Sequence, residues 1–479
     1  MKTGKPIVET EGAVRVLSKA GGMLAVGFTL LFHPAVHAAP GASPEELKQL
    51  GTTRTPWGAE IAGNQDGTIP AYTGGVKPPA GAPAFADSIR PVDPYAADKP
   101  VLTISAANMA QYAGKLTEGT QALLKRWPDY KVEVYPTRRS YPQMAADRAQ
   151  SAIKNAANPE CKTTDDGVGI RGCWGATPFP LPKTGYQVMW NSLTHEQSET
   201  ELRMQSWIVD SAGNRTMTNE AILQNDYPFW DQKVTPYEGV GELYWRFLSK
   251  TLGPSRDAGQ KTVVWYPAEF DSKDQRIWSY TTGQRRTRLA PELTYDTPSA
   301  SLSGALNYDE IGLFAGRMDR FDFKLVGRQE MYVPYNRYKV ITQTPEQLLG
   351  KQFVNPDATR WELHRVWLVE ATRKEGKRHI AAKRRFYIDE DSWAILSSEA
   401  IDDAGKIFRV GQSNGWAQYN RNELGAAGNQ DSCITTYDLS KGQYLVSSYI
   451  NPDSGWTKQI KRMPDYNYRA ESMAGTGVR

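Results

Sequence analysis

Apolar and polar residues alternate along most of the chain beyond residue 186, which is the pattern of strands with two different faces. Turn residues such as Ala212-Gly213-Asn214 and Asp403-Ala404-Gly405 separate several of these segments. Such a succession of hairpins predicts a mainly β (α+β) fold with one large, curved antiparallel sheet. The predicted strands are 186–193, 202–210, 215–223, 242–249, 262–270, 276–282, 285–289, 322–333, 360–371, 378–388, 393–402, 406–416 and 443–450.

A helical period replaces this alternation in two stretches, at about 105–127 and 142–155. Ser105 and Thr117 are suitable N-caps for two helices in the first stretch. Pro142 is suited to the first turn of a helix in the second stretch. We therefore expect a few helices that cover part of one face of the sheet.

Residues 1–38 have the features of a signal peptide. Four basic residues (Lys2, Lys5, Arg15 and Lys19) precede or border an apolar run at 20–32, and Val36-His37-Ala38 has the small residues of a cleavage site. The run of about 13 residues is shorter than the ~20 that span a bilayer. The sequence thus predicts cleavage near Ala38, export, and a mature chain without a transmembrane span.

The segment 39–100, called the strap below, is rich in Pro and Gly and predicts no long regular element. Its Trp57, Ile61, Ile69 and Tyr72 suggest an extended segment that packs on a core or a partner, with disorder as the alternative. The remainder, 101–479, is predicted to be the β domain.

The chain has three cysteines. In an oxidising compartment, Cys161 and Cys173 are expected to form a disulfide around a Gly-rich loop, and two unpaired thiols are the alternative. Cys433 is left over and is expected to be a small buried residue. Whether it is free stays open.

The composition narrows the class of function. The 479 residues carry 57 Lys and Arg against 53 Asp and Glu, a net charge of +4 that gives no sign of a nucleic-acid binder. The chain also has 14 Trp and 24 Tyr. If the concave face of the sheet keeps aromatic residues, it forms an apolar trough for a hydrophobic ligand. The candidates are Trp207, Trp245, Trp265, Trp278, Trp361 and Trp367, with ordinary core packing as the alternative for each.

No motif predicts catalysis, a metal site or a cofactor. Gly411-Gln412-Ser413-Asn414-Gly415 has the form G-x-S-x-G, but no helical pattern and no His follow it. The three histidines after the signal peptide, His195, His364 and His379, have no ligand spacing. We therefore expect no catalytic residues, no metal and no cofactor.

Several blocks resemble a known family: TPWGAE (55–60), DGTIPAYTGG (66–75), APEL (290–293), YVPYN (332–336), ELHRVW (362–367) and KRRFYIDEDSW (383–393). The chain resembles the Gram-negative periplasmic family called domain of unknown function 1329. That family is similar to outer-membrane lipoprotein-sorting proteins of the LolA/LolB type. The resemblance covers nearly all of the mature chain.

The resemblance implies a half-open barrel of LolA/LolB type in the periplasm. It implies no catalytic residues, and it suggests RND-type exporters and outer-membrane proteins as partners. The leading hypothesis is a carrier or chaperone that moves a lipid, a lipoprotein acyl chain or a similar hydrophobic ligand between the inner and outer membranes. The alternative is a non-catalytic adaptor subunit of an envelope transport complex, with the strap as its docking segment.

Overall fold

The computed structural model describes residues 41–80, 91–419, 428–430 and 433–475, all within the unit His37–Arg479. The predicted signal peptide 1–38, with its cleavage near Ala38, lies outside the described residues. None of the helices in the described ranges is both long enough and apolar enough to cross a membrane.

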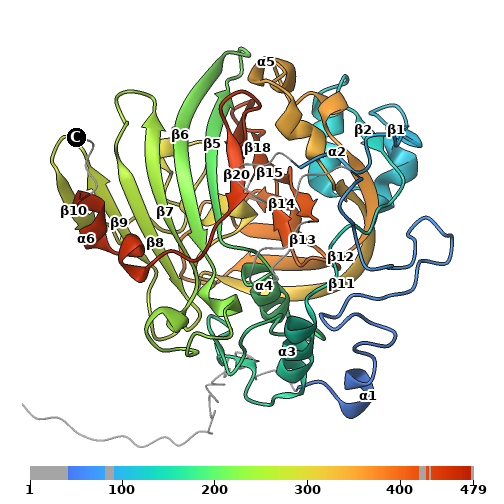
Figure 1. Ribbon diagram of the computed structural model, residues 1–479. Coiled ribbons are helices and arrows are strands. Elements are labelled where there is room, and N and C mark those ends of the chain that lie inside the picture. Colours follow the sequence, from blue (N-terminus) through green and yellow to red (C-terminus); the bar gives the residue numbers. More distant parts are fainter. Residues whose placement is uncertain (1–40, 81–90, 420–427, 431–432, 476–479) are drawn as a thin grey trace, which may run out of the picture. The chain divides into compact units, whose positions relative to one another are not determined.

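One large sheet organises the described residues (Figure 1). Its strands follow the order β1-β2-β12-β13-β14-β15-β18-β19-β5-β6-β7-β8-β9-β10, and β11 pairs with β12 while β20 pairs with β5. All pairs are antiparallel except β2 with β12, which meet in parallel at Trp361 and Val134. The described strands do not close into a barrel, so the predicted large, curved, open antiparallel sheet is confirmed.

Most strands fall within a few residues of their predicted positions. The strands of the large sheet are β1 (Leu102–Ile104), β2 (Val132–Val134), β5 (Thr200–Val209), β6 (Arg215–Asp226), β7 (Leu243–Gly253), β8 (Lys261–Pro267), β9 (Arg276–Thr281), β10 (Arg286–Leu289), β11 (Phe321–Pro334), β12 (Trp361–Arg373), β13 (Lys383–Asp389), β14 (Ile395–Ile401), β15 (Ile407–Ser413), β18 (Ile434–Asp438), β19 (Gln443–Tyr449) and β20 (Trp456–Gln459). Two separate hairpins pair β3 (Lys162–Thr163) with β4 (Ile170–Arg171) and β16 (Trp416–Gln418) with β17 (Gly428–Gln430).

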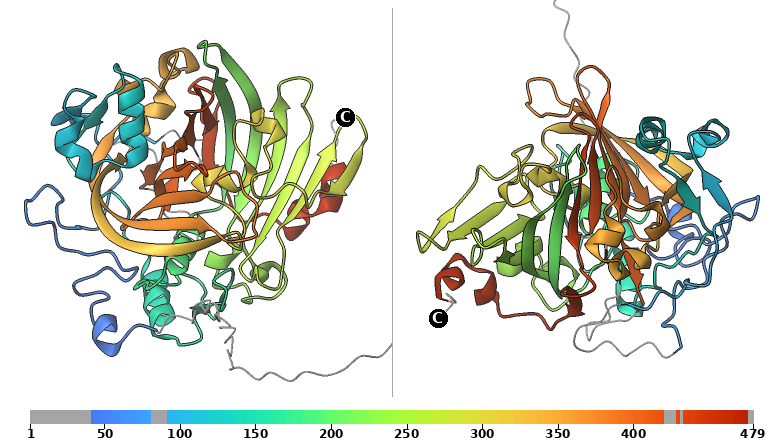
Figure 2. Two further views of the ribbon diagram at one scale, coloured as in Figure 1. Left: turned by 180° about the vertical axis from the view of Figure 1, so that it is seen from behind. Right: turned by 90° about the horizontal axis from the view of Figure 1, so that it is seen from above.

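The sheet is strongly curved along its long strands, as Figure 2 shows for β11. The register of β11 against β12 shifts between Leu325 and Gly327, which is a β-bulge. Gly327 has a φ of 140°, a conformation that only glycine adopts without strain. Bulges bend and twist a strand, so this one contributes to the curvature.

The helices are short. The α-helices are α1 (Pro44–Leu47), α2 (Glu118–Arg126), α3 (Ala146–Ala157), α4 (Gly185–Leu193), α5 (Pro345–Leu348) and α6 (Ala470–Gly475). The 3-10 helices are η1 (Met109–Lys115), η2 (Pro228–Trp230), η3 (Gly239–Glu242), η4 (Ala300–Leu302), η5 (Tyr308–Leu313), η6 (Tyr338–Thr342), η7 (Pro356–Ala358) and η8 (Asp465–Tyr468).

Three helical predictions need correction. The predicted strand 186–193 is the helix α4, whose N-cap Thr184 accepts a hydrogen bond from the backbone of Gln187. In the stretch 105–127, the predicted cap Thr117 of α2 does accept from the backbone of Thr120, whereas the N-cap of η1 is Asn108 and not the predicted Ser105. The second stretch begins later than predicted, because α3 starts at Ala146 and leaves Pro142 outside the helix.

Both faces of the sheet are covered. Along β19, Tyr444 and Val446 pack in the cluster that contains α2, whereas Leu445 between them packs in the cluster that contains α4. Successive strand residues point to opposite faces, so α2 and α4 lie on opposite sides of the sheet. The α4 side is the larger core, and it also contains residues of η4 and η5.

The described cysteines behave as the sequence suggests. Cys161 and Cys173 form a disulfide, and Cys433 is a buried free thiol. The disulfide joins the chain just after α3 to the residue that follows β4 and its glycine.

Candidate ligand-binding site

A cavity of about 230 Å³ lies on the α4 side of the sheet, between strands β5–β9 and the segment 299–315, called the cover below. Its walls come from several parts of the chain that are far apart in sequence. The lining residues are Ser192, Leu193, His195, Gln197, Met204, Ser206, Asn219, Leu223, Asn225, Tyr227, Tyr244, Trp245, Phe247, Ser249, Thr251, Thr262, Val264, Tyr266, Ile277, Ser299, Ser301, Leu302, Leu306, Tyr308, Ile311, Gly312, Phe314, Ala315, Ile395, Ser447 and Ser448.

The floor of the cavity follows from strand alternation. Every second residue of β7 from Trp245 to Thr251 lines the cavity, as does every second residue of β8 from Thr262 to Tyr266. The two strands place these residues directly opposite one another. The facing pairs are Trp245 with Tyr266, Phe247 with Val264, and Ser249 with Thr262. The register therefore sorts the floor into an aromatic end and a hydroxyl end.

The aromatic end is rigidly arranged. The rings of Trp245 and Tyr266 stack at a centroid distance of 4.6 Å with 5° between their planes. The indole Nε1 of Trp245 donates to Oδ1 of Asn225 at 3.2 Å, and Nδ2 of Asn225 donates to Thr200 at 3.2 Å. Burial raises the pKa of Tyr266, so its phenol stays neutral. These contacts hold a flat apolar surface toward the cavity.

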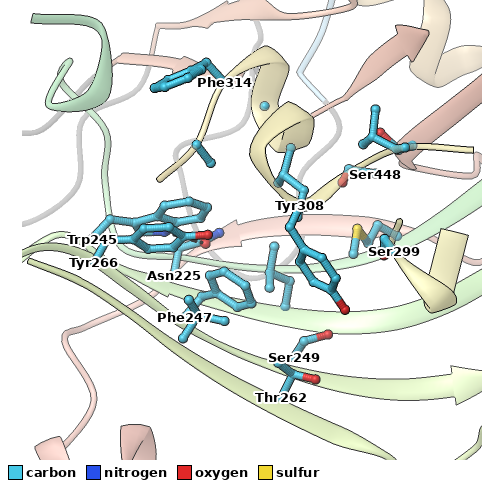
Figure 3. Close-up of a pocket in the computed structure, with 18 of the residues that line it drawn as sticks. Asn225, Trp245, Phe247, Ser249, Thr262, Tyr266, Ser299, Tyr308, Phe314 and Ser448 are labelled. Atoms are coloured by element: carbon cyan, nitrogen blue, oxygen red, sulfur yellow. Dashed lines mark hydrogen bonds between the residues drawn. The ribbon is translucent and has the colours of Figure 1, made fainter. Parts of the chain in front are cut away.

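The other end carries hydroxyl groups. Figure 3 shows Trp245, Tyr266 and Phe247 grouped at one end of the cavity and hydroxyl groups at the opposite end. These hydroxyls belong to Ser249, Thr262, Ser299 and Ser448. Hydroxyl groups both donate and accept hydrogen bonds, so this end suits an alcohol, ether or carbonyl group of a ligand.

The described lining contains no Asp, Glu, Lys or Arg, although these residues make up 23% of the chain. Its one imidazole is already engaged: His195 Nδ1 bonds to the carbonyl of Ser192, and its Nε2 lies 2.8 Å from Nε2 of Gln197. Oε1 of Gln197 accepts from the hydroxyl of Tyr227 at 2.7 Å, which leaves the amide NH₂ to donate to His195. This arrangement fits the neutral imidazole, so the cavity wall is uncharged.

The cover is held by buried ion pairs behind the cavity. Asp309 in η5 accepts from Arg384 at 2.9 Å and bonds to His379 at 2.8 Å. Glu310 lies 2.5 Å from Arg409. Burial raises the pKa of Asp309, but Arg384 and His379 outweigh that effect and leave this pKa below its ordinary value. These pairs fix the cover to β13 and β15.

The cover presents apolar residues from either side of those anchors to the cavity. Tyr308 points inward from η5 (Figure 3), and Ile311 and Phe314 also line the cavity. Gly312, with a φ of 60°, allows the chain to turn between them. Burial raises the pKa of Glu310 although Arg409 lies beside it. The ion pair of Glu310 with Arg409 therefore carries a desolvation cost.

Of the six tryptophans predicted to line a trough, Trp245 is among the described lining residues of this cavity and the other five are not. Trp265 and Trp278 meet at 4.9 Å near the C-terminal helix, where Trp265 donates to the carbonyl of Tyr468. Trp207 packs at the edge of the α2 cluster. The fold does not bring the six together.

The remaining two candidates are on β12. Trp361 is 1% exposed and has the guanidinium of Arg337 at 5.1 Å from its ring. Trp367 stacks with Trp393 at 6.0 Å. Phe247 and Tyr266 line the cavity but were not among the candidates, although the alternation of the predicted strands 242–249 and 262–270 contained the signal for them.

The fold and site define a protein with an open antiparallel sheet and a cavity whose described lining has no acidic or basic residue other than His195. Residues 103–474 match the family described as "Protein of unknown function (DUF1329)". The chain is also 35% identical over 453 residues to the uncharacterized protein PA3922 of Pseudomonas aeruginosa, covering 94% of this chain and 95% of that protein. The chain therefore belongs to the DUF1329 family, which confirms the resemblance found in the sequence.

Similar solved structures include an outer membrane lipoprotein-sorting protein domain from Vibrio parahaemolyticus, 11% identical with a TM-score of 0.39, covering 59% of this chain and 94% of that one. A DUF1329 family protein from Desulfovibrio piger is 12% identical with a TM-score of 0.39, covering 60% of this chain and 97% of that one. A LolA superfamily protein from Nitrosomonas europaea is 8% identical with a TM-score of 0.34, covering 61% and 100%.

Proposed function

We propose that this protein is a non-catalytic periplasmic carrier that binds one uncharged hydrophobic ligand in the cavity and moves it between the inner and outer membranes. The observation that carries the proposal is the uncharged wall, with stacked aromatic rings at one end and hydroxyl groups at the other. A charged group without a partner is costly to bury, so this wall favours neutral ligands over carboxylates and phosphates.

The volume limits the ligand further. The cavity of about 230 Å³ is smaller than the roughly 300–1,000 Å³ of ordinary small-molecule sites. It suits one acyl chain or a compact ring system rather than several chains at once. Burial of the ligand supplies about 25 cal/mol per Å² of apolar surface, and the hydroxyl end orients it.

The site offers poor support for catalysis. His195 has both ring nitrogens engaged, so it is not poised as a general base. Ser413 of the G-x-S-x-G segment ends strand β15, is 3% exposed, and its Oγ accepts from the backbone of Gly415 at 3.0 Å. A nucleophile elbow requires a strand-to-helix turn, whereas strand β16 follows here.

The compartment follows from the predicted signal peptide, and the disulfide suits an oxidising environment. We include in the proposal that the carrier receives or delivers its ligand at envelope proteins, with an RND-type exporter and outer-membrane proteins as partners. Release then requires a membrane or partner that competes for the ligand.

The adaptor alternative depended on the strap as a docking segment. In the described part of the strap, Trp57 is 1% exposed and belongs to the same core cluster as α4. Its indole Nε1 donates to the carbonyl of Asp391 at 2.7 Å. The strap thus uses its main aromatic anchor within its own chain, which favours the carrier.

A variant that fills the cavity tests the proposal. Ser249→Trp adds an indole at the hydroxyl end, whereas Thr216→Trp adds the same group at an exposed position of the neighbouring strand β6. We expect N-phenyl-1-naphthylamine, an uncharged apolar fluorophore, to bind the parent and Thr216→Trp equally. Ser249→Trp should bind it at least about tenfold more weakly, a difference of about 1.4 kcal/mol.

Native mass spectrometry of the three proteins after mild purification gives a second measurement. Co-purified lipid should be present in the parent and in Thr216→Trp and absent from Ser249→Trp. Equal fluorophore binding by all three proteins, or a parent that takes up no apolar molecule, would contradict the carrier proposal.

A further inference from the structure

Several of the sequence blocks that carry the family resemblance meet in a buried cluster of ionisable residues, away from the cavity lining. The blocks 55–60, 332–336, 362–367 and 383–393 all contribute to it. The cluster is formed at the end of β13 and the turn that follows, where it faces β12 and the strap. The carrier proposal makes no use of it.

His364 is oriented by a neighbouring carboxylate. It is 2% exposed, and its Nε2 lies 3.0 Å from Oε2 of Glu362. Both oxygens of that carboxylate accept from groups that can only donate: Oε1 accepts from Arg360 at 2.6 Å, and Oε2 accepts from the backbone of Arg138 at 2.6 Å. An ionised carboxylate only accepts hydrogen bonds, so Nε2 carries the proton and Nδ1 is available as a ligand atom.

That Nδ1 faces a second carboxylate. Oδ1 of Asp389 lies 4.0 Å from Nδ1 of His364, too far for a hydrogen bond. Oδ2 of Asp389 is fully used, since it accepts from the hydroxyl of Tyr335 at 3.0 Å and from the hydroxyl of Ser392 at 2.6 Å. Oδ1, by contrast, is buried and has no hydrogen-bond partner among the described residues.

The other acidic residues of this cluster each pair with an arginine. Asp391 lies 2.6 Å from Arg139, Glu362 lies 2.6 Å from Arg360, and Glu390 lies 2.5 Å from Arg328. Within the described part of the chain, Asp389 has no such arginine partner.

We propose that this cluster binds one divalent transition-metal ion, with Zn²⁺ as the representative, through Nδ1 of His364, Oδ1 of Asp389 and a carboxylate oxygen of Asp391. The three ligand atoms lie within 4.8 Å of one another, and all three residues are buried. Zn²⁺ binds imidazole nitrogen and carboxylate oxygen at about 2.0–2.2 Å, so an ion fits into the 4.0 Å gap.

The outer contacts support a metal rather than a simple ion pair. Metal-binding histidines usually donate their second ring N–H to a carboxylate, as His364 does to Glu362. Tyr335 and Ser392 fix Asp389, and Arg139 fixes Asp391. The imidazole ligand favours a transition metal over Ca²⁺ and Mg²⁺, which prefer oxygen ligands.

The ion would have a structural role, because it would fix the turn that follows β13, and this turn holds the strap. The carbonyl of Asp391 accepts from the indole of Trp57, and Glu390 accepts from the backbone of Glu60 at 3.0 Å. This site could not be predicted from the spacing of its residues, since His364 and Asp389 are on different strands and only the pairing of β12 with β13 brings them together.

Metal content and Zn²⁺ affinity of the full chain test the proposal. The protein is stripped with EDTA, dialysed and titrated with Zn²⁺ against a chromophoric chelator, and its metal content is measured by inductively coupled plasma mass spectrometry. The variants are His364→Gln and Asp389→Asn, with Glu399→Gln as the control. Glu399 is an equally buried acid on the neighbouring strand β14, where it accepts from the backbone of Gly119.

We expect one Zn²⁺ per chain in the parent and in Glu399→Gln, and at least about 100-fold weaker binding in His364→Gln and Asp389→Asn. Circular dichroism shows whether each variant is folded. Substitution of the parent with Co²⁺ gives a measurement that needs no variant, because nitrogen and carboxylate ligands change the visible d–d bands of the ion. A parent that binds no Zn²⁺ and gives no altered Co²⁺ spectrum would overturn the proposal, as would full binding by a folded Asp389→Asn.

Discussion

At the scale of single residues, the three cysteines show how burial decides chemistry. Cys161 and Cys173 are joined in the disulfide, and Cys433 is a free thiol that is 0% exposed. Burial raises the pKa of the Cys433 thiol to about 12. Because the thiolate is the reactive form, this cysteine is expected to be inert in the folded protein.

We therefore expect Cys433 to resist alkylation as long as the protein is folded. With iodoacetamide at pH 8, the native protein should take up no label, and one label per chain should appear after unfolding in urea without reductant. The expected thiolate fraction at pH 8 is on the order of 10⁻⁴, from the four-unit difference between pH and pKa. Mass spectrometry of the intact chain gives the count. Labelling of the folded protein at the rate of an exposed thiol would contradict the buried position.

The same scale shows why the site was only partly predictable. Alternation indicates which residues of a strand share a face, but it does not indicate which face is concave when both are covered. Trp245 pairs with Tyr266, and the next pair is Arg246 with Trp265, so the two tryptophans are on opposite faces. Only the register and the covering elements decide that Trp245 lines the cavity.

At the scale of elements, α4 is the clearest failure of the sequence pattern. Tyr186, Val188 and Trp190 alternate as in a strand, yet residues 185–192 form a helix and are all buried. A helix surrounded by core has no solvent-exposed face, so the 3.6-residue alternation of apolar and polar faces that identifies an amphipathic helix is weak. The nearby strands β5 and β6 were predictable because polar residues interrupt their apolar positions.

The cover consists of two short 3-10 helices, η4 and η5, joined by irregular segments, and its position depends on buried charges. Glu310 pairs with Arg409, which is also 3.6 Å from Asp438. A carboxylate that loses its partner in the core keeps its desolvation cost, typically about 3–5 kcal/mol. The cover is therefore expected to open when this anchor is broken.

Arg409→Met tests that expectation. Hydrogen exchange of residues 299–315 should become faster, while exchange in β5 and β6 should change much less, and the unfolding free energy should fall by about 3–5 kcal/mol. The double variant Glu310→Gln with Arg409→Met removes the charge of Glu310 as well and should recover part of the loss. If Arg409→Met exchanges in the cover as slowly as the parent, the anchor does not hold it.

At the scale of the whole described molecule, the strap connects regions that are remote in sequence. Trp57 packs edge-on against Tyr72 and Tyr141 and donates to the carbonyl of Asp391. In return, the indole of Trp393 donates to the carbonyl of Trp57 at 3.0 Å. Turn-forming Pro and Gly predict an extended segment, but the buried partners more than 300 residues away were not visible in the sequence.

These contacts predict that the strap is integral to the stability of the sheet. Trp57→Ala leaves a large cavity and one unpaired buried carbonyl, and it should lower the unfolding free energy by about 3–5 kcal/mol. Tyr466, which is 55% exposed, gives the matched control. Tyr466→Ala should change the unfolding free energy by less than about 0.5 kcal/mol. Urea unfolding followed by far-UV circular dichroism measures both. The sheet dominates the circular dichroism signal. If the strap is integral to the sheet, Trp57→Ala shifts the whole unfolding transition to lower urea. If the strap folds separately, the main transition of Trp57→Ala stays where it is in the parent, which would contradict the prediction.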